Sequence, residues 1–166
     1  MSDDPLFEQD LRKEAMELWK RGHEAQTRGE LDEAIELYTQ SIRIFPTAEA
    51  YTFRGWALSF QGKVEEAIAE CRRAIETDPE FGNPYNDIGA YLIQQGDYNG
   101  AIPWLERALK APRYDCYFYA HFNLGRVYEK RGDVFRAMKC YKAAYDDNNR
   151  YEQAAKAFRR LQGRVN

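Results

Sequence analysis

The side chains that could act as nucleophiles, general bases or metal ligands are few in this sequence. They are three cysteines, Cys71, Cys116 and Cys140, and two histidines, His23 and His121. No two cysteines have the spacing of a zinc site or a redox pair, and an odd number of cysteines does not suit a disulfide framework. We therefore interpret all three as reduced thiols, expect His121 to be a core histidine, and predict no metal site.

The known catalytic motifs are also missing from the sequence. Ser2, Ser41 and Ser59 have no histidine partner suggested by the sequence. The sequence has no phosphate-binding loop and no dinucleotide fingerprint. Most carboxylates occur in segments such as ELDEAIE and KVEEAIAE, which are typical of the solvated face of a helix. The sequence therefore predicts that the protein is not an enzyme and uses no cofactor.

Charge is distributed unevenly along the 166 residues, whose net charge is −3. Residues 113–166 hold 12 Lys/Arg and 6 Asp/Glu, whereas residues 1–112 hold 12 and 21. A basic patch this small argues against nucleic acid as a partner. No apolar run approaches the roughly 20 residues that span a bilayer, and the acidic N-terminus is not a secretory signal. We expect a cytoplasmic protein whose contact with membranes is peripheral at most.

A ladder of small residues occurs four times in the chain and indicates pairs of packed helices. Successive anchor glycines are 33, 34 and 36 residues apart, a period typical of stacked repeats. A turn glycine follows each anchor after seven residues, and an alanine follows five residues later. A glycine inside a helix costs about 1 kcal/mol, so four in one phase predict close helix crossings. The anchors are Gly22, Gly55, Gly89 and Gly125, the turn glycines Gly29, Gly62, Gly96 and Gly132, and the alanines Ala34, Ala67, Ala101 and Ala137.

This ladder resembles the tetratricopeptide repeat (TPR) over about residues 15–151. The resemblance implies an all-α fold: a right-handed α-solenoid of four TPR-like helix hairpins, with an extended first helix and a C-terminal capping helix. We expect one domain, with an N-terminal helical extension at 1–14, repeats at 15–47, 48–81, 82–117 (with a longer linker) and 118–151, and the capping helix at 152–166.

Two local features add expectations about helix ends. The first helix should run from near residue 5 to about residue 28, so that Phe7 and Leu11 project past the repeats. They either form a hydrophobic end-cap folded on the first repeat or contact another chain. Because Pro103 would interrupt the hydrogen bonding of a helix, we expect that helix to begin late, near Gly100.

The TPR resemblance also implies where a ligand binds, since the first helix of each repeat lines a concave groove in this family. Transferred residue by residue, the lining positions are aromatic and rich in amides, whereas the second helices collect Lys and Glu. Apolar side chains on a face open to water suggest a binding surface, although the twist of the stack could bury some of them. The predicted peptide-binding residues are Trp19, His23, Thr52, Trp56, Phe60, Asn83, Asn86, Tyr119, Phe122 and Arg126, and Ile93, Glu129 and Lys130 also hold lining positions.

One specialised TPR function is disfavoured. Co-chaperones of this family hold the acidic C-terminus of heat-shock proteins with a constellation of Lys, Asn and Arg. The matching positions here lack the cations and include an aspartate: they are Trp19, His23, Phe53, Asn83 and Asp87.

We therefore predict a non-catalytic protein–protein interaction module, an adaptor or scaffold that binds a peptide segment of a partner in its groove. The alternative is an assembly scaffold, linking to cytoskeleton or membrane, that acts through its charged ends and can self-associate. There, the acidic start, SDD with Glu8 and Asp10, would oppose a basic cap at the other end. The cap residues predicted to contact an acidic partner or an anionic surface are Lys156, Arg159, Arg160 and Arg164.

Overall fold

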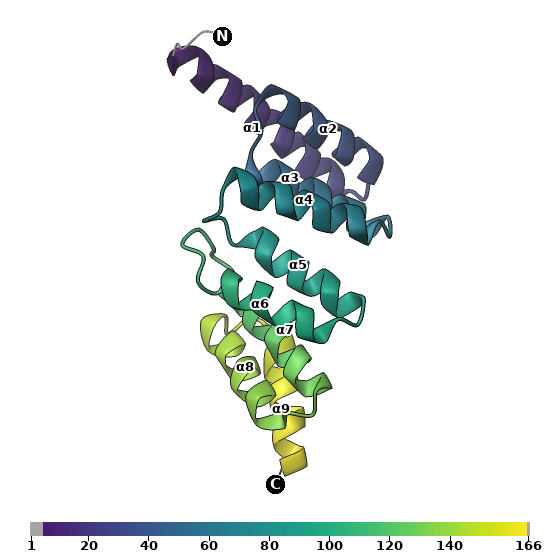
Figure 1. The fold of residues 1–166 in the computed structure, drawn as a ribbon, viewed down its shortest axis with the longest axis vertical. Helices are drawn as coiled ribbons and strands as arrows, with labels where there is room; N and C mark the ends of the chain where they lie inside the picture. The colour runs from purple at the N-terminus through teal and green to yellow at the C-terminus, as the bar shows by residue number, and fades with distance from the viewer. Residues whose placement is uncertain (1–4, 166) are drawn as a thin grey trace. The chain divides into compact units, whose positions relative to one another are not determined.

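A computed structural model describes residues 5–165 and contains nine α-helices over that range (Figure 1). The all-α class, the four helix hairpins and the C-terminal helix predicted from the sequence are confirmed. The SDD segment at residues 2–4, which was predicted to contribute to an acidic end, lies outside the described range. The helices are α1 (Pro5–Thr27), α2 (Leu31–Ile44), α3 (Ala48–Phe60), α4 (Val64–Thr77), α5 (Asn83–Gln94), α6 (Tyr98–Ala108), α7 (Tyr117–Lys130), α8 (Val134–Asp147) and α9 (Glu152–Val165).

The helices form two units. Unit 1 covers residues 1–79 and contains the hairpins α1–α2 and α3–α4. Unit 2 covers residues 80–166 and contains the hairpins α5–α6 and α7–α8, with α9 packed against α8. The expectation that both belong to one domain stays a prediction.

Each hairpin closes through a glycine with left-handed backbone geometry. The four turn glycines have φ between 77° and 85°, which other residues adopt only with strain. The amide after the glycine then donates to a carbonyl near the end of the first helix, as Lys63 N does to Leu58 O at 3.1 Å. The turn positions of the sequence ladder are thus explained by the backbone.

The anchor glycines lie where paired helices approach most closely. A Cβ atom added at Gly125 would lie 2.5 Å from Tyr141 Cε1, and one at Gly89 would lie 2.5 Å from Leu105 Cδ2. At Gly55 the nearest atom is the carbonyl oxygen of Ala67, at 3.0 Å. The predicted helix crossings are therefore confirmed.

One expectation about a helix end was wrong. α6 begins at Tyr98, not near Gly100, because the Asp97 carboxylate accepts a hydrogen bond from Gly100 N at 2.8 Å and caps the helix there. Pro103 therefore lies inside the helix. In α1, whose predicted bounds are confirmed, the first turns extend past the end of α2 (Figure 1). Phe7 is exposed and forms no end-cap on the first hairpin, and the alternative of a contact with another chain stays a prediction.

Candidate functional site

Five rings form a continuous aromatic surface on unit 1, where α1 and α3 present their faces. Trp19 and His23 stack with centroids 5.9 Å apart, and Phe53 meets both edge-on at 5.1 and 5.3 Å. Trp56 lies 5.9 Å from Phe53, and Phe60 lies 5.5 Å from Trp56. The helical spacings of three and four residues place these rings side by side. We call these five residues the unit 1 aromatic surface.

This surface is anchored at one end and open at the other. Trp19 and Phe53 pack against the buried core of unit 1, which includes Tyr38. Trp56 and Phe60 remain 41% and 62% exposed. The exposed rings are therefore held by rings that the core fixes, so an apolar ligand would meet a preformed surface.

Thr52, which the sequence placed among the peptide-binding residues, is buried. Its hydroxyl donates to the carbonyl oxygen of Ala48 in its own helix at 2.7 Å. It presents no free polar group to a ligand, and we leave it out of the site.

In unit 2, α5 and α7 are joined by a polar network. Asn123 Nδ2 donates to Asn86 Oδ1 at 3.1 Å, and Arg126 Nη1 donates to Asn123 Oδ1 at 3.2 Å. Asn86 Nδ2 donates in turn to the carboxylate of Asp87 at 3.4 Å, and burial raises the pKa of Asp87 to about 7. Asn86 is itself buried. Its amide thus bonds within the protein, although the sequence placed Asn86 among the predicted peptide-binding residues. Asn83 begins α5 and is partly buried.

The two predicted aromatics of α7 share a ring from the α8–α9 connection. Tyr119 is exposed and lies 5.5 Å from Tyr151, while Phe122 is partly buried and lies 5.2 Å from the same ring. Phe122 also contacts Tyr141 at 5.4 Å. Of the two residues, Tyr119 offers the larger free surface.

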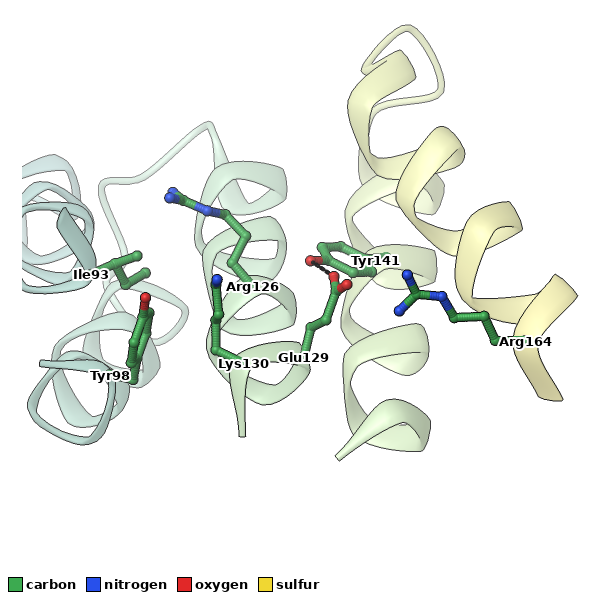
Figure 2. Close-up of a pocket in the computed structure, with 7 residues that line it drawn as sticks. All are labelled: Ile93, Tyr98, Arg126, Glu129, Lys130, Tyr141 and Arg164. Atoms are coloured by element: carbon green, nitrogen blue, oxygen red, sulfur yellow. Dashed lines mark hydrogen bonds between the residues drawn. The ribbon is translucent and has the colours of Figure 1, made fainter. Parts of the chain in front are cut away.

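A cleft of about 410 Å³ opens beside α7 and brings predicted and unpredicted residues together (Figure 2). α7 contributes three residues at positions i, i+3 and i+4, which fall on one face of the helix. The others come from every remaining helix of unit 2. We call this the basic cleft, and its lining residues are Ile93 of α5, Tyr98 of α6, Arg126, Glu129 and Lys130 of α7, Tyr141 of α8 and Arg164 of α9.

The carboxylate in this cleft is already paired. Arg160 of α9 donates to both oxygens of Glu129, at 2.6 and 2.8 Å, and the Tyr141 hydroxyl donates to Oε2 at 2.8 Å. The hydrogen bonds from Arg160 chiefly, with help from Tyr141, lower the pKa of Glu129. Burial, with the hydrogen bond to Glu129 second, raises the pKa of Tyr141. Glu129 therefore remains ionised, and its charge is balanced by Arg160.

The four cations predicted to form one basic cap make different contacts within unit 2. Arg160 bonds Glu129, and Lys156 pairs with Glu152 within α9 at 3.3 Å. Arg164 lines the basic cleft, and Arg159 lines a second cleft of about 310 Å³ between α8 and α9. Contact of these four residues with an acidic partner or an anionic surface stays a prediction.

Sequence reasoning missed two residues of the basic cleft. Tyr98 and Tyr141 come from second helices, whereas the repeat pattern assigns the groove to first helices. No metal-binding group of three or more His, Cys, Asp or Glu occurs among residues 5–165. Over the same range, no helix is both long and apolar enough to cross a bilayer.

Comparison with known proteins gives a family and a fold. A family model described as tetratricopeptide repeat matches residues 20–80 and 86–148. The heat-shock protein cognate co-chaperone sgt12 of Aspergillus fumigatus is 31% identical over 99 residues, which are 59% of this chain and 29% of that protein. The SGT1 homolog of Oryza sativa subsp. japonica is 42% identical over 74 residues, 44% of this chain and 20% of that protein. The chain thus spans under a third of the length of these relatives.

Among solved structures, that of PilF of Pseudomonas aeruginosa matches with a TM-score of 0.86 and 21% sequence identity. The match covers 93% of this chain and 70% of that one. At this identity the likeness shows the fold alone.

Proposed function

Because this chain belongs to the tetratricopeptide-repeat family, we propose that it is a non-catalytic protein-interaction module that binds a peptide segment of a partner on the unit 1 aromatic surface. The family membership supports a role in protein interaction. The finer step, which places the ligand on this surface, rests on the geometry of its five rings.

The observation that carries the proposal is the exposure of Trp56 and Phe60 at the end of an anchored ring series. Single exposed rings are normal on a protein surface, but adjoining exposed rings form a contiguous apolar patch, which is typical of an interaction site. Tryptophan and large aromatics also dominate the energy of protein interfaces, because they bury much area and lose little rotamer freedom on binding. Apolar side chains of an extended or helical peptide would therefore pack here.

The relatives narrow the class of partner only loosely. One relative is described as a heat-shock cognate co-chaperone, and a chaperone is accordingly one partner to test. The positions that the TPR resemblance assigns to a chaperone-tail clamp include Trp19, His23 and Phe53, and these form part of the aromatic surface. We therefore propose recognition of apolar side chains over recognition of a C-terminal carboxylate. The cytoplasmic location expected from the sequence stays a prediction.

The test is a selection of 12-residue peptides from a display library, followed by affinity measurement on matched variants. Trp56→Ala should weaken the selected peptides by at least tenfold, since a central aromatic contributes roughly 2 kcal/mol or more. Phe60→Ala should weaken them as well. The control is Phe135→Ala in α8, which removes a ring that is 77% exposed but lies in unit 2.

Backbone amide shifts would locate the bound peptide. Changes concentrated on α1 and α3 would support the proposal. Equal affinity of the Trp56→Ala variant and the parent, or shift changes confined to α2 and α4, would refute it.

We propose this role over that of a scaffold joined through charged ends, because two of the four cap cations, Lys156 and Arg160, already form ion pairs within unit 2.

A further inference from the structure

We propose that the basic cleft of unit 2 binds an acidic stretch of a partner protein, with at least two acidic side chains contacting Arg126 and Lys130 on one side and Arg164 on the other. This inference deepens the proposed function and rests on it, because it adds a second recognition element of stated chemistry to the same interaction module.

The charge of the cleft supports an anionic ligand. Its lining contains three cations, Arg126, Lys130 and Arg164, and one carboxylate, Glu129. Arg160, which lies outside the lining, pairs with that carboxylate, so the negative charge of Glu129 does not offset the three cations of the lining. Arg126 and Lys130 also have exposed side chains, and Arg164 is exposed near the end of α9. An acidic ligand would meet this charge without first breaking an ion pair of the cleft.

The arrangement of the cations favours a stretch over a single carboxylate. Figure 2 shows Arg126 and Lys130 on one flank of Glu129 and Tyr141, with Arg164 on the opposite flank. Glu129 carries the paired charge between them, so one acidic group cannot meet all three cations there. Successive residues of an extended peptide advance about 3.3–3.6 Å each, which lets acidic side chains a few residues apart reach the two flanks.

The remaining walls suit the rest of such a segment. Ile93 and the ring of Tyr98 lie beside Arg126 and Lys130 and offer an apolar floor for the aliphatic part of Glu side chains (Figure 2). The neighbouring Arg126 is oriented by its hydrogen bond to Asn123, which fixes one nitrogen of the guanidinium and leaves the others for a carboxylate. The cleft is therefore preorganised on its α7 side.

The experiment uses the full chain and a fluorescent ten-residue peptide that carries four glutamates and is blocked at both ends. The comparison peptide has glutamine at the four positions. We expect the glutamate peptide to bind and the glutamine peptide to bind at least tenfold more weakly. Binding of the glutamate peptide should also weaken as salt rises from 0.1 M to 1 M, since the Debye length falls from ~10 to ~3 Å.

Charge-reversing variants locate the site. Lys130→Glu and Arg164→Glu should each weaken the glutamate peptide about fivefold or more, in line with loss of a charge-assisted contact. Lys139→Glu in α8 is the matched control, because it makes the same charge change on an exposed residue of unit 2 that does not line the basic cleft. It should alter the affinity less than twofold. Unchanged amide spectra away from the mutated residue would show that each variant folds.

Three results would overturn the inference: equal effects of Arg164→Glu and Lys139→Glu, equal affinity for the two peptides, or binding only when the peptide has a free C-terminal carboxylate. The last result would identify a site for a chain terminus. The variant Trp56→Ala separates this inference from the proposed function, because it should leave the glutamate peptide unaffected. If Trp56→Ala weakens the display-selected peptides while Lys130→Glu leaves the glutamate peptide unaffected, the basic-cleft proposal alone fails.

Discussion

Replacing Gly125 with alanine should destabilise unit 2, although alanine is the better helix former. The added Cβ would lie 2.5, 2.6 and 3.0 Å from Cε1, Cδ1 and Cζ of Tyr141. Ordinary carbon contacts are about 3.5–4.0 Å, so α7 and α8 would have to separate or the ring would have to move. The ring is buried and its hydroxyl is bonded to Glu129, so neither movement is free of cost.

The magnitude follows from two costs and one gain. Overpacking of a filled core costs roughly 1–3 kcal/mol. Alanine in place of glycine within a helix returns about 1 kcal/mol. If the ring shifts, the hydrogen bond from Tyr141 to the ionised Glu129 weakens too, and such bonds contribute about 1.5–3 kcal/mol. We expect a net loss of about 1–2 kcal/mol in the free energy of unfolding.

The assay is urea denaturation followed by circular dichroism, with Gly163→Ala as the matched control. Gly163 lies in α9, and a Cβ added there meets no atom within 4 Å. The same substitution should therefore stabilise the protein, by roughly 0.5 kcal/mol because the helix end frays and lowers the usual gain. The same substitution should thus lower the free energy of unfolding at Gly125 and raise it at Gly163.

A stability of Gly125→Ala equal to or above that of the parent would refute the reasoning. It would mean that the α7–α8 crossing relaxes without loss, and the packing role assigned to the anchor glycines would fail.

Three further substitutions test other parts of the structure. Gly55→Leu should destabilise unit 1 by about 1–3 kcal/mol or more, because its side chain would meet the carbonyl of Ala67, and an unchanged thermal midpoint would contradict this. Arg160→Met should lower the free energy of unfolding by about 1–2 kcal/mol at pH 7, measured by urea denaturation. Because the pKa of Glu129 is lowered in the folded state, this difference from the parent should shrink as the pH falls below 4.5, the ordinary pKa of a glutamate. Asp87→Asn should instead stabilise the protein, because the pKa of Asp87 is raised from 3.8 to about 7 in the folded state, so the parent loses stability as the pH rises between these values. The free energy of unfolding of the variant should exceed that of the parent by up to about 4 kcal/mol at pH 8 and by much less at pH 4, and a difference that does not change with pH would contradict this.

The hairpins could be predicted from the sequence because their constraints act on the backbone. A left-handed turn and a close helix crossing each allow few residue types, so glycines such as Gly62 and Gly55 predict where the turn and the crossing lie. The start of α6 was misplaced because Pro103 was given more weight than the cap at Asp97. Asp133 occupies the same cap position in the next hairpin, where its carboxylate accepts a hydrogen bond from Arg136 N. Comparison of the two repeats therefore predicts that α6 begins directly after Asp97.

The candidate site was only partly predictable, because pairing between distant side chains is not periodic. The repeat pattern placed Arg126, Glu129 and Lys130 on one helical face, and the structure puts them in one cleft. That Arg160 would reach across 31 residues to Glu129 depends on how α9 docks against α8, which no spacing encodes. Burial of Asn86 likewise depends on Asn123, 37 residues away on α7.

Packing and site chemistry are connected through one side chain of unit 2. The ring of Tyr141 fills the space left by Gly125, and its hydroxyl helps to hold Glu129. Glu129 binds Arg160, which together with the apolar contacts of Leu161 holds α9 against α8, and α9 carries Arg164 to the wall of the basic cleft. The position of Arg164 in the cleft therefore depends in part on a glycine that does not line it. A substitution at Gly125 should weaken the binding of an acidic ligand as well as the fold, whereas one at Gly163 should leave both intact.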